Sequence, residues 1–177
     1  MDWYFIVLNI ALSILFLILL TSFICYLMPF YNRNKQVLSD EIVLPDNILY
    51  KIHHDTIINH IENGRQVESK EYFIKSYDNL TLYGKFYKSF ENAPIEIMFH
   101  GYRGSGERDL STGIIRAKAC GRNVLIVDHR AHGKSEGHTI SFGIKERFDC
   151  LSWINFAIEE FGSDVKIILT GISMGAA

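Results

Sequence analysis

Proline and cysteine are scarce in this sequence, and neither sign of charge is in excess. Three prolines and three cysteines occur among 177 residues, and Cys25, Cys120 and Cys150 are widely separated. An odd number of cysteines without paired spacing fits neither a disulfide framework nor a zinc site. A formal net charge of −2 provides no broad basic surface, so we expect no nucleic-acid partner. The length suits one domain of ordinary size.

Charged residues are absent from Trp3 to Phe30, a run that is almost entirely apolar. As a helix this run would extend about 42 Å, more than the ~30 Å hydrocarbon core of a bilayer requires. Aromatic residues stand near both of its ends, as in the interfacial belts of membrane proteins. The sequence therefore predicts one transmembrane helix over residues 3–30, with membrane lipid as its partner.

A cleaved signal peptide is the competing interpretation of this run. It requires a basic start, an apolar core of about 7–15 residues and a small-residue cleavage site. Met1–Asp2 carries no basic side chain, the apolar run is longer, and no Ala-x-Ala follows it. These features favour an uncleaved anchor. Because Arg33 and Lys35 follow the run, the positive-inside rule predicts a single-pass protein whose catalytic part is cytoplasmic.

Residues 31–68 are predicted to form a connector with one amphipathic helix. Asp46, after Pro45, is a suitable N-cap, and Asn63–Gly64 is a suitable end. The helix would lie either on the membrane or over the edge of the domain. Histidines on it would project in different directions, so no metal site is expected. Its apolar face would consist of Ile48, Leu49, Ile52, Ile57, Ile58 and Ile61.

From residue 69 onward, short strands alternate with helical patterns. Glu71–Ser76 and Leu80–Ser89 predict an antiparallel hairpin. Further strands are expected at Ile95–Phe99, Asn123–Asp128 and Val165–Thr170, separated by single helices. This order predicts an α/β fold, a mostly parallel sheet with helices on both faces. The first helix is expected around Asp109–Ala119 and is ended by Gly121. The second is expected to begin after the cap Ser141 and to end at Gly162. Its buried face would consist of Ile144, Phe148, Leu151, Ile154, Ile158 and Phe161.

A serine stands in a glycine-flanked turn directly after the last strand. Gly171–Ile172–Ser173–Met174–Gly175 fits the pattern G-x-S-x-G. At a sharp strand-to-helix turn, the serine takes a strained backbone conformation that raises its Oγ above the sheet. Only small residues two positions to either side let such a turn close. Ser173 is therefore the candidate nucleophile.

A second polar turn, His100–Gly101–Tyr102, follows an earlier strand. Placed there, the backbone N–H of Tyr102 would pair with that of Met174 to form an oxyanion hole, which stabilises a tetrahedral intermediate. We expect the His100 side chain to be buried and hydrogen-bonded, shaping the loop rather than acting as a base.

The segment Asp128–Gly137 follows the third strand and contains Gly133–Lys134–Ser135, which resembles the end of a phosphate-binding loop. The glycine that such a loop requires five residues earlier is Asp128, and Glu136–Gly137 does not begin a helix. The sequence therefore indicates no nucleotide cofactor. We expect a turn held by Asp128 and Arg130.

In order and spacing, these three turns resemble the α/β-hydrolase superfamily, in particular bacterial serine aminopeptidase and monoacylglycerol-lipase-like members. The resemblance covers residues 69–177. It implies that Ser173 is the nucleophile, that Met174 and Tyr102 supply the oxyanion N–H groups, and that no cofactor or metal is needed. In this family the acid and the histidine follow the elbow, where only Met174–Ala177 remain. The chain is therefore expected to be an N-terminal half, truncated after the elbow and inactive alone.

The function that follows is a membrane-anchored serine hydrolase. Ser173 would attack an ester, amide or peptide acyl substrate and form an acyl-enzyme. Two alternatives remain open. One is a non-catalytic, membrane-tethered remnant or binding module, and the other is an acyltransferase on the same fold.

Overall fold

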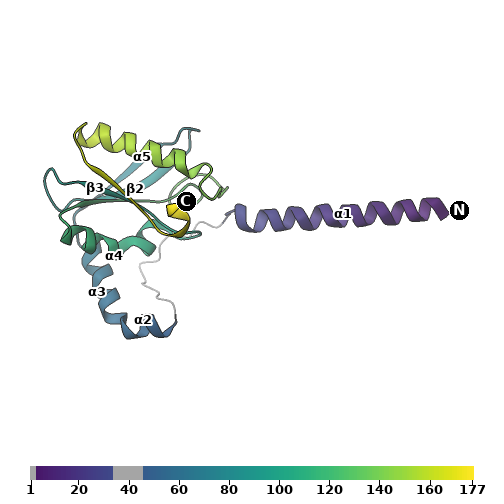
Figure 1. Cartoon of the computed structure of the whole chain (residues 1–177), viewed down its shortest axis with the longest axis horizontal. Helices are drawn as coiled ribbons and strands as arrows, with labels where there is room; N and C mark the ends of the chain where they lie inside the picture. Colours follow the sequence, from purple (N-terminus) through teal and green to yellow (C-terminus); the bar gives the residue numbers. More distant parts are fainter. Residues whose placement is uncertain (1–2, 34–45) are drawn as a thin grey trace.

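The computed structural model describes residues 3–33 and 46–177. Figure 1 shows a long helix that projects from a domain in which helices lie on both sides of a sheet. The helices are α1 (Trp3–Phe30), α2 (Ile48–Ile52), α3 (His54–Arg65), α4 (Gly106–Ala119), α5 (Glu146–Phe161) and the short 3₁₀ helix η1 (Ser173–Ala176). The strands are β1 (Ser69–Lys75), β2 (Thr81–Tyr87), β3 (Ile95–Phe99), β4 (Asn123–Val127) and β5 (Ile167–Gly171).

The helix α1 is long and apolar enough to cross a membrane. It has 28 residues, and none of them is buried in the domain. Three of its polar side chains, Asn9, Ser13 and Thr21, donate hydrogen bonds to carbonyl oxygens one turn earlier. These donors are therefore satisfied within the helix, as a hydrocarbon environment requires. A signal sequence near an N-terminus passes the same test of length and apolarity.

The five strands form one sheet in the order β1-β2-β4-β3-β5. β4, β3 and β5 are parallel to one another, with α4 and α5 as their crossovers. β1 and β2 form the predicted antiparallel hairpin, and β2 is also antiparallel to β4. The sheet is thus mixed, and the expected parallel arrangement holds for three strands. The turn at Ser76–Leu80 is too short for a crossover, so it forces an antiparallel pair.

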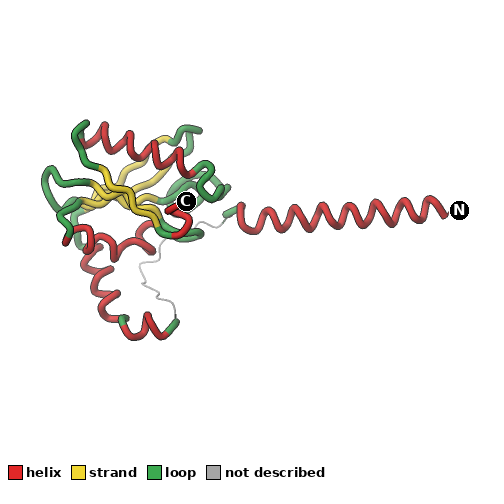
Figure 2. Tube along the Cα trace, in the orientation of Figure 1, coloured by secondary structure: helices red, strands yellow, loops and turns green. Residues whose placement is uncertain are grey.

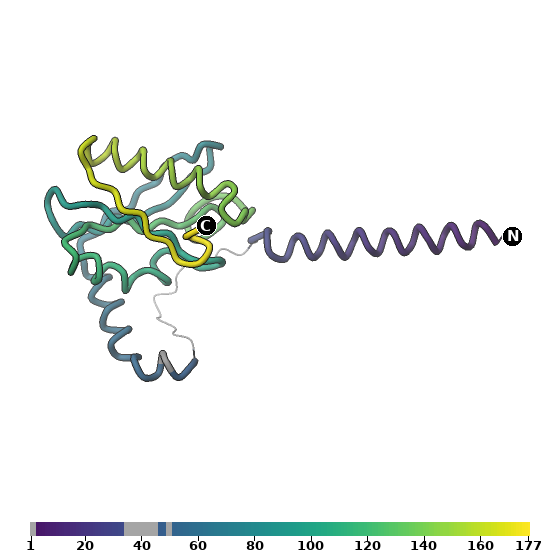
Figure 3. The backbone as a smooth tube through the Cα atoms, viewed as in Figure 1, coloured from purple at the N-terminus to yellow at the C-terminus, as the bar shows by residue number. Residues whose placement is uncertain are grey.

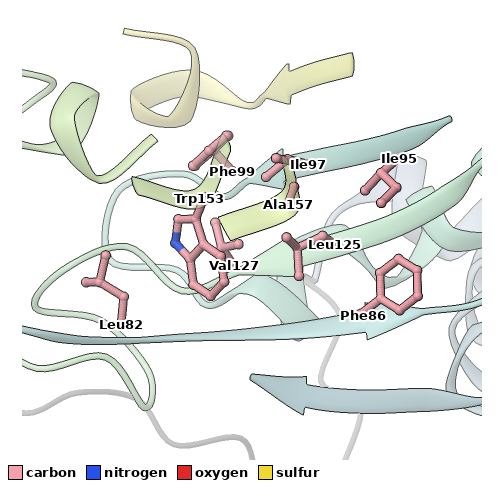
Figure 4. Close-up of a cluster of buried hydrophobic side chains, with 9 residues drawn as sticks. All are labelled: Leu82, Phe86, Ile95, Ile97, Phe99, Leu125, Val127, Trp153 and Ala157. Atoms are coloured by element: carbon pink, nitrogen blue, oxygen red, sulfur yellow. The ribbon is translucent and has the colours of Figure 1, made fainter. Parts of the chain in front are cut away.

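Side chains of the parallel strands alternate between two layers of core, one on each face of the sheet. On one face, Ile97 and Phe99 of β3 pack with Trp153 of α5, as Figure 4 shows. Met98 points the other way and packs with Ile114 of α4. Figure 2 shows these helices on opposite sides of the strands. The predicted helices on both faces are therefore confirmed.

The buried face of α5 differs from the predicted one. The helix buries Trp153 and Ala157 together with two carboxylates, Glu146 and Asp149. Both carboxylates have hydrogen-bond donors within the fold: Asp149 binds the guanidinium of Arg130 at 2.7 Å through both of its oxygens. The apolar spacing therefore predicted the wrong buried face for α5. Periodicity assigns carboxylates to solvent, but hydrogen bonds and ion pairs allow these two to be buried. Four of the six residues expected in the core are exposed: Ile144, Phe148, Leu151 and Ile158.

The start of α5 is also later than expected. Ser141 accepts a hydrogen bond from the N–H of Lys145 at 2.9 Å, so it does cap a turn. The regular helix begins only at Glu146, whose carboxylate accepts hydrogen bonds from the Ser141 N–H and hydroxyl and from the Gly143 N–H. This reciprocal pairing resembles a capping box with a longer turn. Gly162, with φ of 103°, ends the helix as predicted.

The connector contains two helices where one was predicted. α2 and α3 are separated at His53, and α3 continues past Gly64 to Arg65. Gly64 does not end the helix but lets α3 approach α4, since a Cβ there would lie 2.9 Å from the Ser111 carbonyl oxygen. Ile61 is buried in the same region. α3 thus covers the domain, which was one of the two placements expected for this helix. Residues 34–45, including Pro45, lie outside the described part of the chain. The expected N-cap Asp46 is described, but α2 begins only at Ile48, so Asp46 is not its N-cap.

Glu96 is a fully buried carboxylate in the middle of β3. Arg116 and Arg122 form ion pairs with it, and the Thr170 hydroxyl of β5 donates to it. Burial alone would raise the pKa of Glu96, but these three donors hold it below its usual value. The cluster joins β3 to β5 and to α4 at a position where an unpaired charge would be strongly destabilising.

We predict that Gly84→Ala destabilises the fold. A Cβ on Gly84 of β2 would lie 2.7 Å from the Trp153 ring, so that the core would be overpacked by about 1–3 kcal/mol. Urea unfolding followed by circular dichroism should show this loss, and Trp153→Leu in the same chain should recover part of it. The exposed Ser163→Ala is the control and should change the free energy of unfolding by less than about 0.5 kcal/mol. Equal stability of Gly84→Ala and the parent would contradict the prediction.

Candidate functional site

The three turns singled out in the sequence lie at one edge of the sheet. Gly101 follows β3, Asp128 follows β4 and Ser173 follows β5, and these strands are parallel. Carboxyl ends of parallel strands share an edge, which is where open α/β sheets bind ligands. The fold therefore brings all three turns together, as the sequence predicted.

The turn at Ser173 is strained in the expected way. Ser173 has φ of 53°, a left-handed conformation that costs a non-glycine residue of order 1–3 kcal/mol. A Cβ on Gly171 would collide with the carbonyl of Gly175, and a Cβ on Gly175 would lie 2.7 Å from the His100 oxygen. The steric requirement for glycine on both sides of the serine is therefore confirmed. Ser173 is exposed within the described residues.

The loop after β3 is adjacent to this serine. A Cβ on Gly101 would lie 3.7 Å from the Ser173 Cβ, so the next residue, Tyr102, begins beside the elbow. Met174 is buried, with 6% of its surface exposed. Across residues 3–33 and 46–177, the N–H groups of Tyr102 and Met174 donate no hydrogen bond to the protein. This arrangement is compatible with two oxyanion donors, whose role stays a prediction.

His100 shapes this loop and is not available as a base. Its Nδ1 donates to the Gly101 carbonyl at 2.7 Å, and its Nε2 accepts from the His129 N–H at 3.1 Å. A carbonyl can only accept, so the proton is on Nδ1 and the ring is neutral. Burial, followed by the neighbouring histidines His129 and His132, lowers the pKa of His100 to about 2. The expected structural role of His100 is confirmed.

His132 connects the loop after β4 to the loop after β3. Its Nδ1 donates to the Arg130 carbonyl at 2.9 Å, and its Nε2 accepts from the Arg103 N–H at 3.0 Å. Burial lowers the pKa of His132, which keeps the ring neutral. Both ring nitrogens of His100 and of His132 are therefore occupied. Neither ring can take a proton from Ser173 without losing a bond that holds the site together.

Asp128 and Arg130 brace the loop after β4, as expected. Asp128 accepts from the Gly106 N–H at 2.8 Å and from the Lys134 N–H at 2.9 Å. Arg130 is 2% exposed and forms ion pairs with Asp149 and Asp78. Hydrogen bonds from Arg130 lower the pKa of Asp78 to about 2. The segment is a rigid corner with no phosphate-binding helix.

Sequence reasoning did not anticipate that the end of α1 joins this edge. Tyr31 forms an antiparallel bridge with Thr139. The Ile140 N–H donates to the Phe30 carbonyl at 2.8 Å, and the Asn32 N–H donates to the His138 carbonyl at 2.8 Å. The signal in the sequence was only a polar asparagine after an apolar run, which is too general to identify a docking contact.

A cavity of about 640 Å³ lies elsewhere, at the amino ends of β3 and β5. Tyr72, Phe86 and Phe161 line it, together with Ile95 and Lys166. These residues are at the opposite end of the strands from Ser173, so the cavity is not part of the candidate site. Within the described ranges, no cluster of histidine, cysteine and acidic side chains is placed to hold a metal.

Solved structures that resemble this one include esterases and other hydrolases. The esterase Pf2001 of Pyrococcus furiosus is 26% identical, with a TM-score of 0.56 over 81% of this chain and 50% of its own. A serine hydrolase homologue of Coxiella burnetii is 22% identical, with a TM-score of 0.53 over 60% of this chain and 53% of its own. This chain has the α/β-hydrolase fold. The α/β hydrolase GrgF of a Penicillium species shares it, at 22% identity and a TM-score of 0.51 over 60% of this chain and 38% of its own.

The α/β-hydrolase assignment rests on these structures together with the sheet order and the elbow. No sequence profile of a protein family and no curated protein matches the chain. The chain spans about half the length of the esterase it resembles. The likeness supports a hydrolase on this fold.

We predict that stability falls in mild acid because the buried histidines of the α/β-hydrolase edge must stay neutral. Burial lowers the pKa of His100 to about 2 and that of His129 to about 4, from an ordinary 6.5. The unfolded chain therefore binds more protons below pH 6.5. Stability is complete above that pH and falls by about 1.4 kcal/mol per pH unit for each ring.

Urea unfolding of the detergent-solubilised chain at several pH values between 7.5 and 4.5 measures this slope. His129→Gln should reduce it, whereas His60→Gln, on the exposed surface of α3, should leave it unchanged. A free energy of unfolding that is constant over this range would contradict the prediction.

Proposed function

We propose that this protein is a membrane-anchored serine hydrolase that acts on ester, amide or peptide acyl groups through an acyl-enzyme on Ser173. The observation that carries the proposal is the left-handed backbone of Ser173 between two glycines at the carboxyl end of β5. A non-glycine residue is held in this conformation only where the surrounding structure compensates its cost, which is typical of functional turns. The likeness to the Pyrococcus furiosus esterase supports a hydrolase.

In this proposal the Ser173 hydroxyl oxygen attacks the acyl carbonyl. The carbonyl oxygen becomes negative in the tetrahedral intermediate, where the N–H groups of Tyr102 and Met174 would stabilise it. The leaving group departs as the acyl-enzyme forms, and water then releases the acid. Donors that are already fixed by the Gly101 loop and the elbow would need little reorganisation.

A general base is the remaining requirement. A serine hydroxyl is a weak nucleophile at neutral pH unless an adjacent base takes its proton. His100 and His132 are committed to the loops through both ring nitrogens, and the buried His129 is bonded through Nε2 to the His100 carbonyl. We infer that the working enzyme contains a histidine and an acid supplied by sequence beyond Ala177, and that residues 1–177 alone have little or no turnover.

The membrane part of the proposal is that α1 is a retained anchor. Three contacts beyond its apolar run support retention: the bridge of Tyr31 to Thr139, and the bonds of Asn32 to His138 and Ala131. Asn32 is 8% exposed, so the junction is part of the folded domain. Cleavage near it would remove packed residues. Basic residues follow α1, beginning with Arg33, and none precedes it. The positive-inside rule therefore favours a cytoplasmic domain.

We predict that an organophosphonate probe labels Ser173 in the chain extended by its natural downstream sequence. Ser173→Ala should abolish labelling, and the exposed Ser163→Ala should retain it. The extended chain should also hydrolyse a short nitrophenyl ester far faster than residues 1–177. Loss of a triad histidine costs on the order of 10⁶ in turnover.

Two outcomes would contradict the assignment. Labelling that persists in Ser173→Ala would place the nucleophile elsewhere, and equal turnover of the two chains would place the base within residues 1–177. Release of the acyl group to an added alcohol in preference to water would indicate an acyltransferase.

We predict that α1 stays attached and in the membrane. Alkaline carbonate should leave the chain in the membrane fraction, and N-terminal sequencing should begin at or near Met1. A reporter enzyme fused after Gly64 should be active in its cytoplasmic form and inactive in its exported form. A mature chain that begins beyond residue 25 would overturn the anchor, and the opposite reporter pattern would overturn the orientation.

A further inference from the structure

The carboxyl end of α1 is held by the two residues that follow Gly101. The Arg103 guanidinium donates to the Met28 carbonyl at 2.5 Å and to the Tyr31 carbonyl at 3.3 Å. The Tyr102 hydroxyl donates to the Pro29 carbonyl at 3.0 Å. Carbonyls in the last turn of a helix lack partners within the helix, and a cation is favourable there. Arg103 and Tyr102 therefore cap α1, and we call these contacts the α1 clasp.

A second set of contacts holds α1 from the loop after β4. Besides the bridge between Tyr31 and Thr139, the Phe142 ring contacts the Phe30 ring edge-on at 5.5 Å. Phe142 also stacks on Tyr102 at 5.2 Å. The end of α1 is thus enclosed by the same two loops that border Ser173. It cannot swing independently of them while these contacts persist.

The clasp also bears on the proposed oxyanion donor. Arg103 has φ of 51°, a left-handed conformation, and its N–H is fixed by His132. Its guanidinium holds α1, so the backbone after Tyr102 is constrained from both sides. Residues in such conformations persist only where the surroundings over-determine them.

The direction of α1 determines which side of the domain would face a membrane that α1 spans. Figures 1 and 3 show that α1 leaves the domain on the side where the chain ends after Ser173. A helix that spans the bilayer therefore brings the carboxyl edge of the sheet, rather than α3 or the amino edge, to the membrane surface.

Large apolar side chains are exposed on the same edge. We define the rim as Tyr102, Phe142 and Ile144, which are 37%, 42% and 68% exposed. They come from the loops after β3 and β4. Aromatic residues near a membrane surface are stabilised in the headgroup layer, and apolar surface is stabilised by leaving water. The rim continues the aromatic end of α1, so the bilayer is the partner that fits it.

We propose that the α1 clasp positions the catalytic edge against the bilayer, with the rim in the headgroup layer and Ser173 opening toward the membrane surface. This rests on the proposed membrane span of α1 but not on the chemistry at Ser173. Arg103 is a positioning residue in this arrangement.

Depth-dependent quenching tests the proposal in the full chain. The native cysteines are replaced (Cys25→Ala, Cys120→Ser, Cys150→Ala) and an environment-sensitive dye is attached at Ile144→Cys of the rim. The matched control is Ser163→Cys, which is exposed at the amino edge of the sheet. In phosphatidylcholine vesicles that contain a lipid with a nitroxide near the headgroup, we expect at least a twofold loss of fluorescence at position 144. At position 163 we expect none. Equal quenching at the two positions overturns the proposal.

The clasp is tested in the same labelled background. Tyr102→Phe with Arg103→Gln removes the donors to α1, and the quenching at position 144 should fall toward the value at position 163. Lys118→Gln, an equal change of charge on the exposed face of α4, should have no effect. Unchanged quenching in the clasp variant would show that other contacts orient the domain and would overturn the role of Arg103.

The chemistry and the orientation can fail separately. Ser173→Ala should keep full quenching at position 144, because orientation does not depend on the nucleophile. A chain that is labelled at Ser173 but not quenched at position 144 would retain the hydrolase and lose this inference. Extraction of the chain by alkaline carbonate would overturn the anchor and the inference together.

Discussion

The end of β3 and the elbow after β5 approach so closely that no side chain fits between them. Gly175 lies against the Phe99 and His100 carbonyls, and Gly171 lies against Gly175. This contact forces Ser173 into its left-handed conformation and raises it above the sheet. It also fixes Gly101 next to Ser173, and with it the loop that carries Tyr102. The register of β5 on β3, including Phe99 with Gly171, is what places these backbones in contact.

Neutral histidines hold the loops of this edge together, although histidine at an active site suggests catalysis at first sight. His100 and His132 each donate through Nδ1 and accept through Nε2, so that each ring bridges two stretches of backbone. Protonation would convert an acceptor into a donor facing another N–H group. These hydrogen bonds therefore hold the loops of the edge at neutral pH, and protonation of the rings in acid would break them. Arg130 pairs with Asp149 of α5 and with Asp78 in the turn of the hairpin, and so links both elements to this edge.

The end of α1 and the candidate site are held together by direct contacts. Tyr31 and Asn32, directly after α1, bond to the segment after β4. The loop after β3 adds the contacts of Tyr102 and Arg103. The turn at Ser173 is thus packed against the end of β3, while the loops beside it contact the end of α1. The geometry of the edge depends on both.

Local chemistry in the sequence determined much of this architecture. Short runs of β-branched, aromatic and other apolar residues, with turn residues between them, located the five strands, and Gly162 located a helix end, because these signals are local in the chain. The G-x-S-x-G turn was predictable for the same reason, whereas the partners of Asp128 and Arg130 outside their own loop lie 19 or more positions away and were not. Tertiary structure decided which face of α5 is buried, because Arg130 and Ser141 satisfy carboxylates that periodicity assigns to water. It decided that Gly64 is a packing contact with α4 and that β2 runs antiparallel to β4. It also decided that α1 ends against Arg103, since contacts between residues more than seventy positions apart leave no periodic trace in the chain.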